Sequence, residues 1–198
     1  MTRETNMMAK KERGRSVGHM KTTDLVLTGL MAALICIAGP LSIPLPFTPV
    51  PISLTNLAIY IALFLIGWKR GTISYLVYLL LGFAGLPVFS KGQAGAAVLL
   101  GPTGGYLVGF IFIAVISGIM IEKYAGKVLP SVVGIIIGLT ITYLFGTVWF
   151  CFQAGVGFAE ALGMCVFPFL PGDAVKIIIA VILGPMLRKH LQKEGVIE

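Results

Sequence analysis

The chain has 198 residues, of which 57% are hydrophobic and only 12% are charged, and its formal net charge is +7. A mean hydropathy of +0.97 leaves too little polar surface to cover a water-soluble globule. We therefore predict an integral membrane protein.

Four charge-free runs, at residues 25–68, 71–90, 92–121 and 128–159, are each long enough to cross a hydrocarbon core of roughly 30 Å. The runs are continuously apolar and do not alternate with period two, which favours helices over a β-barrel. We predict an all-α bundle of six transmembrane helices: Leu25 to Ala38, Ser53 to Gly67, Thr72 to Leu86, Gly104 to Ile121, Val132 to Phe150 and Pro171 to Leu187.

The predicted organisation is a cytoplasmic tail at residues 1–22, a six-helix membrane domain at 23–190 and a C-terminal tail at 191–198. With a cytoplasmic N-terminus, every Lys and Arg except Lys91 and Lys176 falls in an inside segment. The positive-inside rule therefore predicts that both termini are cytoplasmic. The net positive charge then reflects topology and anionic lipid, and we expect no nucleic-acid partner.

The first outer connection, residues 39–52, contains five prolines and no charged residue. Proline fixes φ and cannot continue a helix, so this segment is predicted to be stiff and extended. A rigid apolar segment at the membrane face would make a suitable lid over a binding site.

The other two outer connections are also long. Residues 87–103 are rich in glycine, which lets backbone approach a ligand closely; a tight turn into the next span is the simpler explanation. Residues 151–170 contain Phe158 to Leu162, for which we predict one or two helical turns at the interface.

Small residues recur at four-residue spacing, as in Gly29 and Ala33 of the first predicted helix. Such pairs let helices approach closely within lipid. Packing inside the protein explains most of them, although a pair on the first helix can also serve a partner protein.

Asp173 and Lys176 lie three residues apart at the head of the last apolar helix, on one face. Ionisable residues in a membrane helix are costly and usually mark a polar pathway or a binding site. The two side chains could also neutralise each other as a structural ion pair. As a site, Asp173 would accept hydrogen bonds and Lys176 would meet an anion.

Further candidates from other segments supply polar groups and apolar walls for the same site. They are Thr55 and Asn56 at the start of the second helix, Gln93 and Tyr106 beside the glycine-rich loop, and Phe47 and Phe89 as apolar walls. Each of them singly could instead satisfy neighbouring helices or anchor the membrane interface.

The sequence lacks the chemistry of an ATPase or a hydrolase. It has no Gly-x-x-x-x-Gly-Lys-Ser/Thr motif, and its histidines, His19 and His190, lie in the predicted tails. Cys36, Cys151 and Cys165 show no metal-ligand spacing. We expect a binding pocket without catalytic residues, metal or cofactor.

Four segments, in this order, carry a family resemblance: residues 49–57 (PVPISLTNL), 85–89 (GLPVF), 101–110 (GPTGGYLVGF) and 168–176 (PFLPGDAVK). They resemble the biotin-specific substrate-binding subunits, or S components, of energy-coupling factor (ECF) transporters, known as the BioY family. The resemblance extends from about Thr22 to His190.

The resemblance implies a six-helix S component in the plasma membrane of a prokaryote. It implies biotin binding in the outer half of the bundle, together with a transmembrane coupling subunit and two cytosolic ATPases as partners. Gly29 and Ala33 would then face the coupling subunit. Asp173 would accept ureido N–H groups of biotin, and Lys176 would bind its carboxylate or its ureido oxygen, with the two roles open to exchange.

Two alternatives remain open at the level of the sequence. One is an S component for another small vitamin, because the fold would be shared while the pocket differs. The other is a stand-alone ion-coupled transporter in which Asp173 and Lys176 relay charge. A lipid-modifying enzyme is the weakest reading, since no nucleophile and base are paired.

Overall fold

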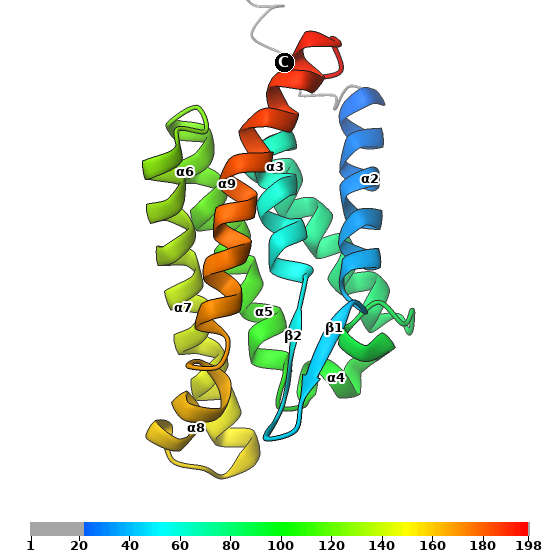
Figure 1. The fold of residues 1–198 in the computed structure, drawn as a ribbon. Coiled ribbons are helices and arrows are strands. Elements are labelled where there is room, and N and C mark those ends of the chain that lie inside the picture. Colours follow the sequence, from blue (N-terminus) through cyan, green and yellow to red (C-terminus); the bar gives the residue numbers. More distant parts are fainter. Residues whose placement is uncertain (1–21, 198) are drawn as a thin grey trace, which may run out of the picture.

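The structure is a computed structural model that describes residues 22–197 as a helical bundle with one small β-hairpin (Figure 1). Its main elements are α2 (Thr22–Ala38), β1 (Ser42–Leu45), β2 (Thr48–Ser53), α3 (Thr55–Phe83), α4 (Ala96–Leu100), α5 (Gly104–Phe112), α6 (Gly118–Lys123), α7 (Val128–Ala154), α8 (Phe158–Cys165) and α9 (Leu170–Lys193). A 3₁₀ turn, η1, covers Ser90–Gly92, and a π-helical segment, η2, at Ile113–Ser117 joins α5 to α6.

Helix α3 contains two arms that meet at Gly67, where φ is +77° and ψ is 175°. This backbone conformation is strained for any residue with a Cβ. The second arm folds back along the first, since a Cβ on Gly71 would lie 3.5 Å from the Leu63 Cα. The Trp68 N–H that the bend frees donates to the Glu122 carboxylate of α6 at 3.1 Å.

Four segments of the described chain are long and apolar enough to cross a membrane: Thr55–Phe83, Gly104–Lys123, Val128–Ala154 and Leu170–Lys193. The apolar helix α2 is shorter. The prediction of a helical bundle with several apolar spans is confirmed at this level. Two of the six predicted spans correspond to the two arms of α3, and the bend falls at Gly67, just before the Trp68 to Gly71 segment predicted to connect them.

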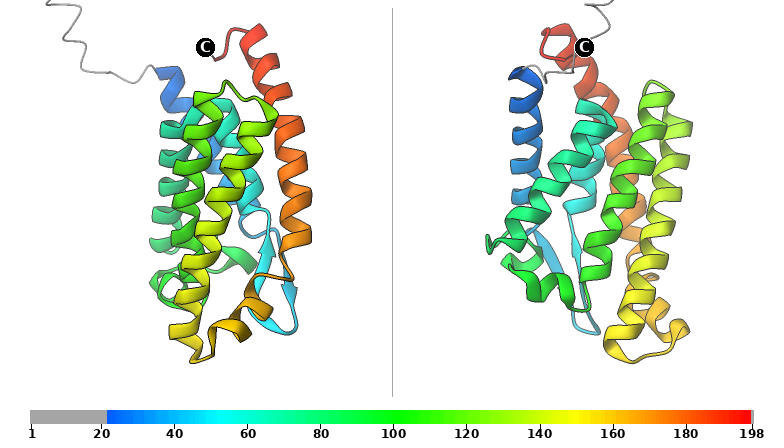
Figure 2. Two further views of the ribbon diagram at one scale, coloured as in Figure 1. Left: turned by 90° about the vertical axis from the view of Figure 1, so that its left-hand side faces the viewer. Right: turned by 180° about the vertical axis from the view of Figure 1, so that it is seen from behind.

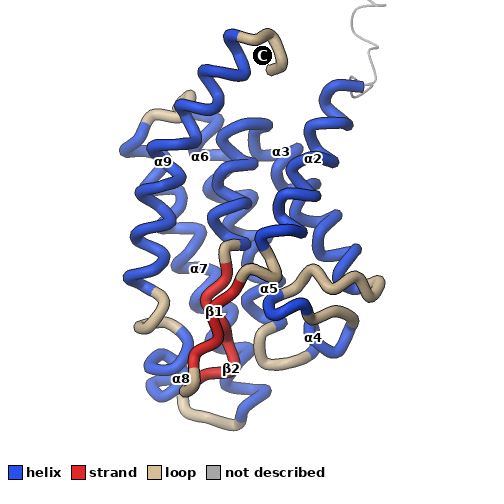
Figure 3. The backbone as a smooth tube through the Cα atoms, turned by 45° about the vertical axis from the view of Figure 1, so that its right-hand side comes forward, coloured by secondary structure: helices blue, strands red, loops and turns tan. Residues whose placement is uncertain are grey.

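The proline-rich segment forms an antiparallel hairpin in which Ser42 lies opposite Ser53 and Ile43 opposite Ile52 (Figure 3). The prediction of an extended segment is confirmed, but the pairing of two strands was not predicted. Both strands are edge strands, which tolerate proline because one side of each needs no ladder hydrogen bonds. Along β2, Thr48 and Val50 are buried while Pro49 is exposed.

The two other connections that were predicted to lie on the outer face also contain ordered structure. Helix α8 confirms the helical turns predicted around residues 158–162. Helix α4, within the glycine-rich connection, was not predicted.

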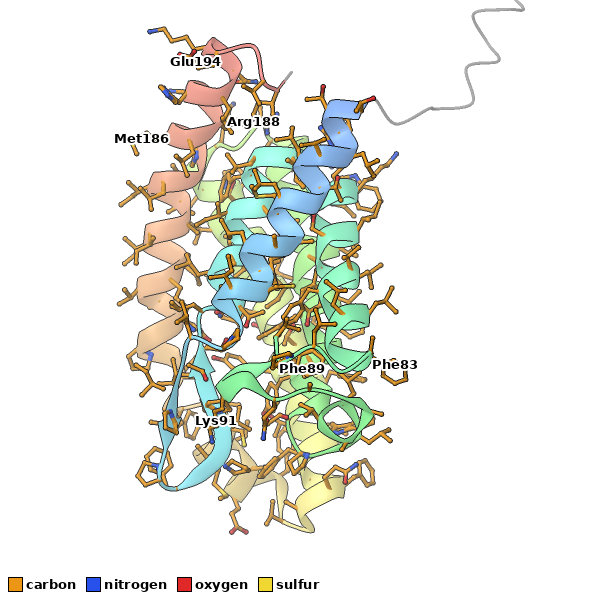
Figure 4. All side chains as sticks on the ribbon, turned by 90° about the vertical axis from the view of Figure 1, so that its right-hand side faces the viewer. Phe83, Phe89, Lys91, Met186, Arg188 and Glu194 are labelled. Atoms are coloured by element: carbon orange, nitrogen blue, oxygen red, sulfur yellow. The ribbon has the colours of Figure 1, made fainter. Side chains whose placement is uncertain are left out.

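The two ends of the described chain lie together, opposite the hairpin, α4 and α8 (Figures 1 and 2). Figure 4 shows Arg188 of α9 near this end and Lys91 of η1 toward the other. A cavity bordered by Lys69, Arg70 and Arg188 places these cations at one end of the bundle. The basic residues of the N-terminal tail, which were predicted to be cytoplasmic, lie outside the described residues.

Aromatic side chains and close helix contacts build the core. The ring of Tyr78 lies 5.4 Å from that of Tyr75 and 5.6 Å from that of Phe89, and all three residues are fully buried. Gly184 of α9 packs on Phe64 of α3 so closely that a Cβ on it would lie 2.4 Å from the Phe64 ring. Helices α3 and α9 therefore contact each other through a glycine, which fixes the position of α9.

We predict that Gly184→Ala destabilises the protein by about 1–3 kcal/mol, because overpacking forces the two helices apart. Gly163→Ala in α8 is the matched control, since a Cβ there meets nothing within 4 Å. Thermal unfolding in detergent checks the pair. Equal melting temperatures for the two variants would contradict the close packing of α9 on α3.

Candidate functional site

Asp173 and Lys176 lie in the first turns of α9, with exposed fractions of only 5% and 7%. Pro171 suits the first turn, where a helix leaves N–H groups unpaired, and the same end favours a negative charge such as Asp173. The Lys176 Nζ lies 3.0 Å from the Asp173 Oδ1. The two ionisable groups therefore form a buried ion pair.

Two further donors converge on the Asp173 carboxylate. The Asn56 Nδ2 of α3 donates to Oδ1 at 2.8 Å, and the Tyr143 hydroxyl of α7 donates to Oδ2. One carboxylate therefore joins three helices, and it accepts a charged and two neutral hydrogen bonds. A buried charge requires hydrogen bonds and a paired countercharge of this kind.

Two cavities of about 50 Å³ each lie against strand β2 of the hairpin, and the first of them adjoins this ion pair. Both are lined by the same five residues: Val50, Pro51, Ser53, Tyr106 and Phe110. The first adds the polar end, with Asn56, Tyr143, Asp173 and Lys176, and the apolar residues Leu139, Cys165 and Phe169. The second adds Phe89, Ser90, Gln93, Val98, Thr103 and Leu107.

The shared wall makes the two cavities neighbours, so they form one polar-ended, mostly apolar region. Small-molecule pockets usually measure about 300–1,000 Å³. Each cavity is smaller than that, so a ligand of ordinary size requires the wall to move. The wall that both cavities share is largely strand β2.

The hairpin is held over the cavities by a small number of side-chain contacts. The Thr48 Oγ1 lies 3.8 Å from the Cys165 Sγ of α8, and the Lys91 backbone N–H donates to the Ser42 Oγ at 2.9 Å. Burial raises the pKa of the Cys165 thiol, so this group is a neutral thiol at neutral pH. The hairpin is also attached by apolar packing, since Val50 belongs to the cluster that contains Tyr106 and Phe169, and Ile52 packs against that cluster.

The structure brings together six of the eight predicted ligand residues: Asp173, Lys176, Tyr106, Asn56, Gln93 and Phe89 line one or both cavities. The other two lie apart from the cavities. The Thr55 hydroxyl bonds with the Ser53 Oγ at 2.6 Å. Phe47 lies at the tip of the hairpin and is 52% exposed.

Gly29 and Ala33, predicted to contact a partner, lie on an exposed face of α2. A Cβ on Gly29 would meet nothing within 4 Å in the described chain. Large exposed apolar residues, Leu25, Val26 and Leu30, flank it.

Sequence reasoning missed Tyr143, which completes the carboxylate network. The available signal was a hydroxyl in the middle of an apolar predicted span. Phe110 and Phe169 were also missed, because aromatic residues in apolar helices are usually core residues.

The site's geometry can be compared with that of known proteins. The sequence model of the BioY family matches residues 8–193. The biotin transporter BioY of Rhizobium etli is 39% identical over an alignment of 174 positions, and the alignment covers 83% of this chain and 92% of that protein. The biotin transporter BioY of Thermotoga maritima is 36% identical over 165 residues, covering 83% of this chain and 95% of that protein.

A solved structure is also similar. It is the crystal structure of the S component for biotin from an ECF-type ABC transporter, and its TM-score is 0.79 at 34% sequence identity. The match covers 86% of this chain and 95% of the other. The similarity therefore extends to the arrangement of the helices as well as the sequence.

We predict that Tyr143→Phe lowers stability by about 1.5–3 kcal/mol, because it removes a hydrogen bond to a buried charged acceptor. The matched control is Tyr60→Phe, since the buried Tyr60 hydroxyl has no hydrogen-bond partner in the described chain and its loss should be neutral or stabilising. Thermal unfolding in detergent compares the two. A larger loss for Tyr60→Phe would refute this account of the network.

Proposed function

This chain belongs to the BioY family, and from that premise we propose that it binds biotin as the substrate-binding subunit of an ECF-type ABC transporter. The observation that carries the proposal is the buried Asp173–Lys176 pair at the polar end of an otherwise apolar cavity. Biotin offers ureido N–H donors, an apolar bicyclic ring and a carboxylate. These groups require an acceptor, an apolar wall and a cation, and the site supplies all three.

Asp173 is the proposed acceptor for the ureido N–H groups. Its Oδ2 accepts from Tyr143 alone in the described chain, so a lone pair remains for a ligand N–H. Lys176 donates to the ureido oxygen or to the carboxylate of biotin. The aromatic rings of Tyr106, Phe110 and Phe169 form the apolar wall around the bicyclic ring.

The proposed membrane arrangement has six crossings: α2, the two arms of α3, the helix from Gly104 to Lys123, α7 and α9. The described chain begins and ends at the same end of the bundle, which supports an even number of crossings (Figure 1). The gathering of Lys69, Arg70 and Arg188 at that end supports a cytoplasmic location for it. The hairpin and the site then face the outside of a prokaryotic plasma membrane.

The proposed partners are a transmembrane coupling subunit and two cytosolic ATPases. The proposal agrees with the sequence, which has no nucleotide-binding motif of its own. The exposed Gly29–Ala33 face of α2 is the proposed contact with the coupling subunit, because small residues allow a close helix–helix approach. The proposed site needs no cofactor or metal.

We predict that biotin binds to the purified chain with one-to-one stoichiometry. Asp173→Asn and Lys176→Ala should each weaken binding by about 10-fold to 100-fold, because each removes a charge-assisted hydrogen bond worth about 1.5–3 kcal/mol. Calorimetric titration measures the effect, with Lys91→Ala as the exposed control. A folded wild-type chain that gives no heat with biotin would show that the ligand is wrong, and other vitamins would then be titrated.

The methyl ester of biotin distinguishes the two roles of Lys176 in the same titration. If Lys176 pairs with the carboxylate, Lys176→Ala should no longer weaken binding when that carboxylate is esterified. If Lys176 donates to the ureido oxygen, the loss should persist with the ester.

We also predict that a disulfide between the hairpin and α8 blocks the site. Thr48→Cys places a second thiol beside Cys165, where the native Oγ1 and Sγ are 3.8 Å apart. Oxidation before biotin is added should abolish binding, oxidation afterwards should trap biotin, and reduction should reverse both effects. Radiolabelled biotin provides the measurement.

The control for the cross-link is Thr48→Cys combined with Cys165→Ser, which retains Cys36 and Cys151 but cannot link the hairpin to α8. Oxidation should leave its biotin binding unchanged. Rapid biotin exchange in the cross-linked protein would show that the ligand enters by another path.

A further inference from the structure

A third cavity lies at the end of the bundle opposite the hairpin, and it shares no lining residue with the two cavities of the proposed biotin site. Its volume is about 460 Å³, far larger than either cavity of the biotin site. Side chains of four elements border it: Asp24 of α2, Lys69 and Arg70 beside the bend of α3, Glu122 of α6 and Arg188 of α9. Figure 4 shows Arg188 near this end of the bundle.

The two carboxylates of this cavity are engaged. Asp24 pairs with Arg70, and Glu122 accepts the Trp68 backbone N–H at 3.1 Å. These contacts hold α2 and α6 against the bend of α3. They leave neither carboxylate as the partner of Lys69 or Arg188.

The two remaining cations have unused donors. Among residues 22–197, the Lys69 ammonium has no carboxylate within salt-bridge distance, and it lies 5.7 Å from the centre of the Trp68 ring. Arg188 donates one N–H to the Phe64 carbonyl at 3.5 Å, and within residues 22–197 the other N–H groups of its guanidinium have no recorded hydrogen bond. Guanidinium and ammonium groups at a shared cavity are suited to a phosphate, which only accepts hydrogen bonds.

An apolar stripe continues from the same cavity. Ile73 lines the cavity and is 41% exposed, and Leu76 and Leu80 lie three and seven residues further along the same arm of α3 and are also exposed. Residues at this spacing share one face of a helix. A ligand with a phosphate and long hydrocarbon chains would therefore meet cations first and an apolar surface beside them.

We propose that this cavity binds the phosphate headgroup of an anionic phospholipid, with its acyl chains lying along Ile73, Leu76 and Leu80. Basic pockets between helices at the cytoplasmic face suit such headgroups. Inorganic phosphate would contact the cations alone, whereas a bound anionic phospholipid would contact the cations and also place its chains on the adjacent apolar stripe. The lipid satisfies both features.

Two double variants with equal loss of charge test the proposal. Lys69→Gln with Arg188→Gln removes the free cations of the cavity. Lys123→Gln with Lys189→Gln removes two exposed cations of α6 and α9 that do not line it. Native mass spectrometry with added phosphatidylglycerol or phosphatidylcholine measures lipid retention, and thermal unfolding in the same lipids measures stabilisation.

We predict that phosphatidylglycerol binds better than phosphatidylcholine, and that the cavity variant, which removes two cations, weakens this binding by about thirtyfold, at about 1 kcal/mol per cation. The control variant should change it less than twofold. Lys69→Gln alone should give part of the loss of phosphatidylglycerol binding. This single variant keeps the Arg188 contact with Phe64, so it tests the cavity even if the double variant folds poorly.

Three results would overturn the proposal. One is an equal loss in both double variants, which indicates non-specific attraction. Another is a stabilisation by inorganic phosphate that equals the stabilisation by phosphatidylglycerol, when phosphatidylcholine is the only lipid in the phosphate sample. The third is unchanged lipid binding with loss of association to a coupling subunit, which would make the cavity a protein contact. Biotin titration of the same samples keeps this test separate from the proposed function.

Discussion

The carboxylate of Asp173 is the interaction on which the site depends. A buried charge is tolerated only when it is paired and hydrogen-bonded, and here donors from α3, α7 and α9 supply three such contacts. The contacts that stabilise this buried charge also fix the relative positions of three helices. The proposed ligand recognition and the packing of the three helices therefore depend on the same atoms.

The hairpin covers the candidate site, because three residues of β2 line both cavities. An outer connection of the same length made of helix would bury its side chains in the bundle. The proline-rich strands instead pair mainly with each other and contact the rest of the protein at Thr48, Ser42 and the buried face of β2. Proline limits the backbone conformations available to both strands, which favours movement of the hairpin as one unit.

The sequence predicted the helical membrane bundle and the Asp173–Lys176 pair, because a charge in an apolar helix is conspicuous. It did not reveal that Asn56 and Tyr143 would meet Asp173, since Asn56 and Asp173 lie 117 residues apart and only tertiary packing brings them together. It likewise indicated that residues 39–52 are extended but not that they pair, because pairing depends on cross-strand contacts.

The positions of Thr55 and Phe47 show why proximity along the chain is a weak guide. Successive residues of a helix point about 100° apart, so Thr55 faces Ser53 while Asn56 faces Asp173. Phe47 lies at the turn of the hairpin, outside the strand residues whose alternation buries Thr48 and Val50. In both cases the element was located correctly, but the direction of the side chain depends on the register.

The wall shared by the two outer cavities limits how ligand selectivity can change. Val50, Pro51 and Ser53 border both cavities, so a substitution in β2 alters the polar end and the far end together. Residues such as Leu139 and Gln93 each border only one cavity. Divergence toward a ligand that differs at one end is therefore expected to proceed through the helices and the second outer connection, while β2 remains nearly constant.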